Sequence, residues 1–299
     1  MVNDNSASRR SPGEGLSVLI PVFNEEGSIK GTLEKIKESV KTLRVPSELI
    51  VIDDGSTDGT GQILRSVQGI TLLVNAYNLG YGASLKRGLK EANYPWIFIV
   101  DADGTYPIED LPKLWSFHAQ YDMVVGARTG KNVHVPLLRK PAKFILTRLA
   151  CFLTRKKIPD LNSGMRLFKK QVAMEFFHLF PSRFSFTTTL TLACLTNDYL
   201  VKWVPINYFS RQGTSTVKPI NDFVSFNKTI FKVVFYFEPL RFFLWPGILL
   251  CLSGLAYGLY QVLTSIPRDL GQFPFILFLS GLQIILLGFI AELIAKSRK

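Results

Sequence analysis

Two aspartates, Asp101 and Asp103, follow the apolar stretch at residues 96–100 with a single residue between them. Carboxylates held just beyond a buried strand can converge on one divalent cation. Mg²⁺ and Mn²⁺ suit carboxylate oxygens, and Mg²⁺ usually pairs one or two carboxylates with substrate phosphates rather than an all-protein cage. The pair therefore indicates a diphosphate site, and hence a nucleotide-sugar site. The alternative is an ordinary turn, where Asp is common.

A second acidic pair, Asp53 and Asp54, follows the apolar stretch at residues 48–52. Continuous apolar strands that alternate with helices predict a parallel sheet covered on both faces. Ligands bind such sheets at the carboxyl ends of the strands, and both acidic pairs lie there. The predicted strands are 17–22, 48–52, 71–75 and 96–100, and the predicted helices are 24–41, 60–67 and 82–92. Further along, we expect strands at 123–126 and 201–209, a loop that leads into a strand at 161–168, and helices at 137–154 and 185–195.

The chain has 35 Lys and Arg against 23 Asp and Glu, a net charge of +12. Its basic residues are scattered, and no nucleic-acid-binding motif accompanies them, so we expect no nucleic-acid partner. Phosphorylated substrates and an anionic membrane surface explain the charge as well. The three cysteines are far apart, which suits a reducing compartment. Residues 1–15 are polar and are expected to form a disordered tail rather than a signal peptide.

The composition becomes strongly apolar after Lys218. Residues 219–239 place phenylalanines at helical spacing beside lysines, which predicts an interfacial amphipathic helix; a buried amphipathic helix is the alternative. Residues 240–263 and 275–295 are each long enough to cross a bilayer, and their short connection predicts a transmembrane hairpin. We expect residues 16–218 to form the catalytic domain and residues 240–299 the hairpin with its basic tail.

Basic residues follow the second predicted span, which favours a cytosolic C-terminus. The catalytic domain and both termini are then expected to be cytosolic, at the plasma membrane of a prokaryote or the endoplasmic reticulum of a eukaryote. The bilayer is thus a predicted partner, and a two-helix anchor is also compatible with a homo-oligomer.

Several motifs together resemble the family 2 glycosyltransferases, and more narrowly the dolichyl-phosphate mannose synthase and polyprenyl-phosphate glycosyltransferase branch. They occur in the family's order over about residues 16–240. The resemblance implies an α/β fold of the GT-A, Rossmann-like type, with a mixed sheet flanked by helices. The motifs are IPVFNE (20–25), VIDDGSTDGT (51–60), NLGYG (78–82), DADG (101–104), VGAR (125–128), DLNSGMRLF (160–168) and RQGTS (211–215).

The resemblance also implies roles for single residues on the donor side. Asp101 and Asp103 would hold Mg²⁺ or Mn²⁺, with Ala102 under the sugar. Asp54 and Asp58 are expected to be turn or helix-cap carboxylates. The implied site for the nucleotide-diphosphate sugar comprises Pro21, Phe23, Glu25, Val51, Asp53, Asp101, Ala102, Asp103, Arg211 and Lys218.

On the acceptor side, the resemblance implies that Arg128, Arg139 and Ser215 bind the phosphate of a polyprenyl phosphate, either dolichyl or undecaprenyl. Asp101, Asp103 and Arg128 would be the catalytic residues of an inverting transfer. Residues 184–189 carry no carboxylate where sugar-accepting relatives often place a base, which favours a phosphate acceptor. Thr105 stands where a third metal ligand is common in the family.

Two alternatives stay open at this point. A glycosyltransferase that acts on a glycan or polysaccharide would share the catalytic domain, but the chain shows neither a QxxRW-type motif nor a larger helical bundle. A catalytically silent membrane scaffold would keep the fold, although the retained Asp101, Asp103, Arg128 and Arg211 argue against it.

Overall fold

The computed structural model describes residues 14–130, 147–148, 150–152, 154–182, 185–210, 235, 239–264 and 271–296. Most of the predicted N-terminal tail and of the predicted interfacial helix at 219–239 lies outside these residues. The same holds for most of the predicted helix at 137–154, whose described C-terminal part is helical up to residue 154.

The described strands form one mixed sheet with the order β3-β2-β1-β4-β6-β5-β7. The first four strands pair in parallel, as the sequence predicts, whereas β6 runs antiparallel to both β4 and β5. The mixed sheet implied by the family resemblance is therefore confirmed. The strands are β1 (Leu16–Val22), β2 (Ser47–Asp53), β3 (Thr71–Val74), β4 (Trp96–Ile99), β5 (Met123–Ala127), β6 (Arg166–Lys169) and β7 (Val201–Pro205).

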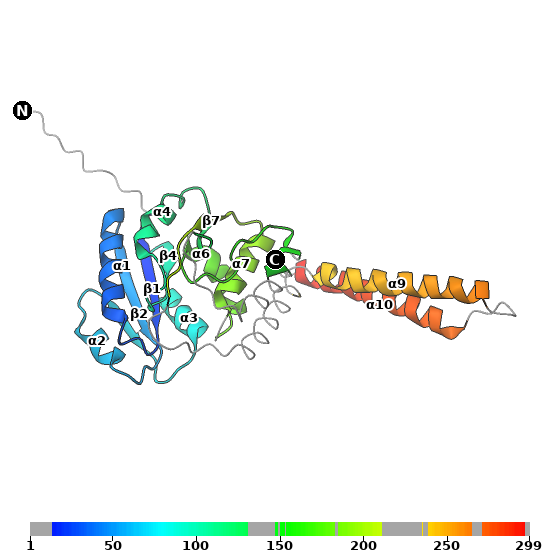
Figure 1. Ribbon diagram of the computed structural model, residues 1–299, viewed down its shortest axis with the longest axis horizontal. Helices are drawn as coiled ribbons and strands as arrows, with labels where there is room; N and C mark the ends of the chain where they lie inside the picture. The colour runs from blue at the N-terminus through cyan, green and yellow to red at the C-terminus, as the bar shows by residue number, and fades with distance from the viewer. Residues whose placement is uncertain are drawn as a thin grey trace, which may run out of the picture.

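Helices cover both faces of the sheet, as Figure 1 shows. Successive strand residues point to opposite faces, so Val18 and Phe98 enter one core while Leu19 and Ile97 enter the other. This double burial explains the uninterrupted apolar strands. One core includes α1 (Ile29–Leu43), α2 (Thr60–Ser66), η1 (Ile108–Asp110) and α4 (Leu111–Trp115); the other includes α3 (Tyr81–Glu91), α6 (Lys170–Glu175), η3 (Phe177–Leu179) and α7 (Phe186–Thr196).

Two predicted boundaries differ from the structure, whereas a third predicted segment agrees with it. Helix α1 begins at Ile29 rather than near residue 24, because Asn24 has a left-handed backbone (φ 55°) and its side chain bonds the neighbouring loop. The predicted loop-to-strand segment at 161–168 is confirmed, with a loop up to Met165 and a strand from Arg166. Strand β7 ends at Pro205, four residues before the predicted end.

Helices α9 (Pro239–Thr264) and α10 (Gln272–Lys296) form the C-terminal hairpin, which extends away from the sheet domain (Figure 1). Both are long and apolar enough to cross a membrane. Their backbones approach closely at glycines, as is common between membrane helices. A Cβ added at Gly281 would lie 2.6 Å from the Gly247 carbonyl oxygen, and one at Gly254 would lie 2.8 Å from the Pro274 oxygen.

We expect Gly281→Val to separate the two helices, because the added atoms meet the backbone of α9 rather than a flexible side chain. Thermal unfolding of the purified full-length protein in nanodiscs measures this, with an expected loss of about 1–3 kcal/mol from overpacking. Leu282→Val is the matched control, since the neighbouring Leu282 is 41% exposed. Equal melting of the two variants would contradict the close packing.

Candidate active site

The loop that follows β4 carries Asp101 and Asp103 at the carboxyl edge of the sheet. The start of helix α1 holds this loop in place, because Ser28 Oγ and Thr32 Oγ1 donate hydrogen bonds to the Ala102 carbonyl oxygen at 2.9 and 3.1 Å. Ala102 is buried. The aspartate pair therefore rests on a fixed backbone, which is what a preorganised binding site requires.

Thr105 orients the carboxylate of Asp103. Its backbone N–H and its hydroxyl donate to Asp103 Oδ1 at 3.1 and 2.6 Å, and Asp103 is 8% exposed. Sequence reasoning noted only that Thr105 replaces a possible metal ligand. In the structure, the two hydrogen bonds from Thr105 hold one carboxylate oxygen of Asp103 in place.

Gly164 contacts the carboxylate of Asp101 directly. A Cβ added at Gly164 would lie 2.8 Å from Asp101 Cγ and 2.9 Å from Oδ1. On another side lies Tyr81, whose buried hydroxyl stays neutral, since burial and then the negative charge of Asp101 raise its pKa well above the ordinary value. The loop at 160–165 thus packs against the aspartate pair, a contact that sequence reasoning missed.

Gly164→Ala should therefore displace Asp101 without unfolding the domain. We expect a fall of about a hundredfold in the turnover of the protein's reaction, because small misplacements of reacting groups have effects of that size. Gly31→Ala is the control, since a Cβ there meets nothing within 4 Å. Initial rates at saturating substrate measure the effect, and equal rates in both variants would show that the Asp101 position does not matter.

The predicted nucleotide residues lie at the ends of β1 and β2. Pro21, Val51 and Asp53 are buried and Phe23 is half-buried. Asp53 Oδ1 accepts a hydrogen bond from Ser56 N–H at 2.9 Å. Glu25, whose N–H donates to Thr60 Oγ1 at 2.8 Å, is likewise only partly exposed.

Hydrogen bonds join the loops after β1 and β2 into one rim. Asn24 Oδ1 accepts from Thr57 N–H, and Glu26 Oε2 accepts from Gly59 N–H, both at 2.8 Å. Side-chain oxygens of the first loop therefore accept hydrogen bonds from the backbone of the second loop.

The carboxylates of Asp54 and Asp58 stabilise the turns that precede two helices, as the sequence predicts. Asp54 accepts bonds from Asn75 Nδ2 (2.7 Å) and from the N–H groups of Leu79 (3.0 Å) and Gly80 (2.8 Å), which fixes the turn before α3. Asp58 Oδ1 accepts from Thr60 N–H at 3.0 Å at the start of α2.

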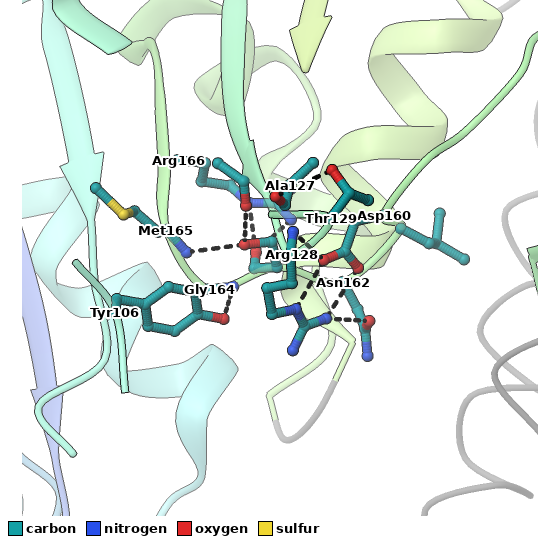
Figure 2. Close-up of polar contacts among 12 residues, drawn as sticks. Tyr106, Ala127, Arg128, Thr129, Asp160, Asn162, Gly164, Met165 and Arg166 are labelled. Carbon is teal, nitrogen blue, oxygen red and sulfur yellow. Dashed lines mark hydrogen bonds and ion pairs between the residues drawn. The ribbon is translucent and has the colours of Figure 1, made fainter. Parts of the chain in front are cut away.

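Arg128, at the end of β5, forms a two-pronged ion pair with Asp160 (Figure 2). Its Nε and Nη2 donate to the two Asp160 oxygens at 2.7 and 2.9 Å, and Nη2 also donates to Asn162 Oδ1 at 2.9 Å. The Asp160 side chain is fully buried and that of Arg128 is 13% exposed. These bonds do not use the two N–H groups on Nη1, which can still meet a ligand.

Two tyrosines enclose this ion pair. The Tyr106 hydroxyl accepts from Gly164 N–H at 2.7 Å (Figure 2), and its ring meets Tyr208 edge to face at a centroid distance of 5.1 Å. The Arg128 guanidinium lies 5.2 Å from the Tyr208 ring centroid. Burial raises the pKa of both phenols. Both hydroxyls therefore stay neutral and do not compete with Asp160 as counter-ions of Arg128.

Arg166 is a fully buried guanidinium at the first residue of β6. Its Nε donates to the Ser163 oxygen at 3.0 Å, and its Nη1 donates to the Thr187 oxygen at 2.8 Å and to Thr191 Oγ1 at 2.9 Å. Burial lowers its pKa to about 10, which leaves it charged at neutral pH. Arg166 ties the loop at 160–165 to helix α7, and sequence reasoning missed it because a basic residue in a strand has no distinctive pattern.

The ligands of a metal ion here would be Asp101, Asp103 and the substrate. Within the described residues no group of three or more His, Cys, Asp or Glu could hold a metal ion. Two carboxylates plus diphosphate oxygens are nevertheless a common donor set for Mg²⁺. Arg139, Arg211, Ser215 and Lys218, the remaining predicted site residues, lie outside the residues that the structure describes.

Two family models match the chain. Residues 17–177 match glycosyl transferase family 2, and residues 238–297 match the GtrB C-terminal hairpin. A dolichyl-phosphate hexose transferase of Haloferax volcanii is 26% identical over 74% of this chain and 94% of its own length. An undecaprenyl-phosphate 4-deoxy-4-formamido-L-arabinose transferase of Yersinia enterocolitica is 26% identical over 94% of this chain and 88% of its own length.

Other relatives are longer than the region they share with this chain. The match spans 51% of a low-salt glycan biosynthesis hexosyltransferase of Haloferax volcanii. Among solved structures, the glucosyl-3-phosphoglycerate synthase of Mycobacterium tuberculosis, in complex with Mn²⁺, uridine diphosphate and glucosyl-3-phosphoglycerate, aligns with a TM-score of 0.57. It is 18% identical over 74% of this chain and 79% of its own, so the likeness is one of fold.

Proposed function

The chain belongs to glycosyl transferase family 2, and we propose that it transfers a sugar from a nucleotide-diphosphate sugar to a polyprenyl phosphate at a membrane surface, with inversion at the sugar carbon. The observation that carries this proposal is the placement of an aspartate pair and Arg128 at one sheet edge of a domain joined to an apolar hairpin. The names of two relatives that match 74% and 94% of this chain support the same reaction.

In this proposal the donor lies across the ends of β2, β1 and β4. Asp53 and Val51 contact the nucleotide, and Pro21, Phe23 and Glu25 line its pocket. Asp101 and Asp103 hold Mg²⁺ or Mn²⁺, which when bound neutralises charge on the leaving diphosphate. Thr105 keeps Asp103 aimed at that position. Arg211 and Lys218 belong to the donor site on the family resemblance alone.

The acceptor phosphate lies beyond β4, toward Arg128, with Arg139 and Ser215 as further ligands. Asp160 fixes the Arg128 guanidinium through its Nε and Nη2, and the N–H groups on Nη1 donate to the phosphate. A phosphate monoester is largely ionised at neutral pH and needs no strong base to attack the sugar. The α7 segment at residues 185–189 accordingly carries no carboxylate.

The hairpin orients the reaction toward the bilayer. The start of α9 contacts the domain, since Arg241 Nη1 donates to the Phe152 oxygen at 3.5 Å and the Phe152 and Trp245 rings lie 6.5 Å apart. The far ends of α9 and α10 point away from the domain (Figure 1). With basic residues after α10, we place the domain and both termini in the cytosol. Self-association through the outer faces of the hairpin is testable by mass measurement in nanodiscs.

A glycan acceptor is the alternative that one experiment separates. The purified full-length protein is incubated with Mn²⁺, a panel of UDP- and GDP-sugars, and either farnesyl phosphate or free oligosaccharides. We expect one donor to yield a lipid-phosphate-linked sugar, detected by mass spectrometry. Transfer to oligosaccharides alone would overturn the lipid acceptor.

A further inference from the structure

Helix α7 begins at the same sheet edge as the aspartate pair. Arg166, which pairs with Ile99 at the carboxyl end of β4, donates to the oxygen of Thr187 in the first turn of α7. At the other end of the helix the chain reaches Leu200, whose oxygen accepts from the N–H of Met123 at the start of β5. The N-terminus of α7 therefore faces the edge where the strands end and chemistry is expected.

The N-cap and first turn of α7 carry three buried hydroxyls that lack a partner among the described residues. Ser185 is 5% exposed and Thr188 and Thr189 are fully buried, yet none of their hydroxyls has a hydrogen-bond partner among the described residues. Ser185 is the N-cap of α7, and Thr188 and Thr189 follow in its first turn. Later in the same helix Thr191 and Thr196 bond the carbonyl oxygens four residues earlier, at 2.8 Å each. Unpaired buried hydroxyls are destabilising, so three on one turn call for a ligand.

The first turn of α7 carries no negative charge of its own. No side chain caps α7 and its first turn has no acidic residue, so its N–H groups and helix dipole are not neutralised there. The buried Arg166 guanidinium bonds neutral oxygens of Ser163, Thr187 and Thr191. Ser185 itself has a left-handed backbone (φ 80°), which is strained for a residue other than glycine. These features favour an anion.

We propose that Ser185, Thr188 and Thr189 at the N-terminus of α7 form a phosphate subsite that receives the phosphate of the acceptor lipid. This inference rests on the proposed function and adds the residues that would bind its acceptor. The hydroxyls donate to phosphate oxygens and the helix N–H groups supply the positive end of a dipole. Arg128 contacts the same phosphate from the side of β5.

Strand order assigns the subsite to the acceptor rather than to the donor diphosphate. Along the sheet, the predicted nucleotide residues lie at the ends of β2 and β1, and the aspartate pair lies at the end of the next strand, β4. Arg166 on β6 and Arg128 at the end of β5 come after them. Nucleotide, metal position and α7 therefore lie in that order along the edge. An inverting transfer needs the attacking and leaving oxygens on opposite sides of the sugar, which this order provides.

The test compares wild-type protein with Thr188→Val and with Thr188→Val/Thr189→Val, which replace hydroxyl by methyl at nearly constant volume. We expect KM for farnesyl phosphate to rise about tenfold per hydroxyl, since hydrogen bonds to a charged group have that strength. The KM for the nucleotide sugar should not change. Melting temperatures without ligand should be equal or higher in the variants, because no bond is lost on substitution. Thr196→Val, at the far end of α7, is the control with an unchanged KM.

Two results would overturn the subsite. One is an unchanged KM for farnesyl phosphate in the double variant. The other is a raised KM for the nucleotide sugar alone, which would assign the hydroxyls to the donor. The shift in melting temperature on adding inorganic phosphate provides a readout without turnover. If wild-type protein transfers to no polyprenyl phosphate, the proposed function is wrong, and an equal phosphate-induced shift in wild type and double variant would then refute the subsite separately.

Discussion

Asp103→Asn is expected to lower the transfer rate by about a thousandfold while the protein remains folded. The two bonds from Thr105 both go to Asp103 Oδ1, and the Oδ1 of an asparagine can accept them unchanged. The amide nitrogen then replaces the second carboxylate oxygen. On the proposed assignment, the pair loses one negative charge and one metal ligand, and the metal no longer neutralises charge on the leaving diphosphate.

Three measurements test this prediction. Initial transfer rates give the loss of activity, electron paramagnetic resonance of Mn²⁺ with the nucleotide sugar gives the loss of metal binding, and melting temperature reports folding. Glu109→Gln is the matched control, because this exposed acidic residue lies six positions further on in η1. A variant that transfers sugar at the wild-type rate would refute the assignment of the metal to the aspartate pair.

Asp160→Asn is expected to destabilise the protein by about 3 kcal/mol, because it leaves Arg128 without its counter-charge in a largely buried position. The carboxylate accepts two bonds from the guanidinium and a third, at 3.0 Å, from the Arg128 N–H. An asparagine can keep only one oxygen in this arrangement. The freed guanidinium should also lose its orientation, so activity falls with stability.

The Asp160 prediction is measured by thermal unfolding of the full-length protein in detergent. Asp198→Asn is its control: Asp198 pairs with Lys156 at 3.2 Å with side chains 94% and 40% exposed, and such surface pairs contribute at most about 1 kcal/mol. Asparagine also tolerates the left-handed backbone of Asp198 (φ 58°). If the two variants melted alike, the buried ion pair would not be a structural anchor.

Much of the fold could be predicted from the sequence because it depends on local patterns. Apolar runs such as residues 96–100 must lie in a doubly covered sheet, and the two long apolar segments must form the hairpin. The family membership expected from the ordered motifs is confirmed by the match over residues 17–177. The part of Asp58 was also predictable, since its bond reaches the N–H of Thr60 two residues on, whereas the partners of Asp54 lie 21 to 26 positions away.

The site beyond the first four strands depended on contacts that no local pattern reports. Asp160 could have been suspected from the acidic residue that opens the DLNSG motif, yet only its buried pairing with Arg128 shows what it does. The contact of Gly164 with Asp101 joins residues 63 positions apart, and the antiparallel β6 is what brings them together. Long-range contacts of this kind are decided by packing rather than by spacing.

Asp101 and Asp103 illustrate the division. The sequence alone determined that two carboxylates end a buried parallel strand, because periodicity and burial are local consequences of residue type. Only the tertiary structure decided how those carboxylates are held, with Thr105 on one, Gly164 and Tyr81 against the other, and the start of α7 at the same edge. The reason is physical: hydrogen bonds and close contacts between distant segments exist only once the sheet has set its strand order.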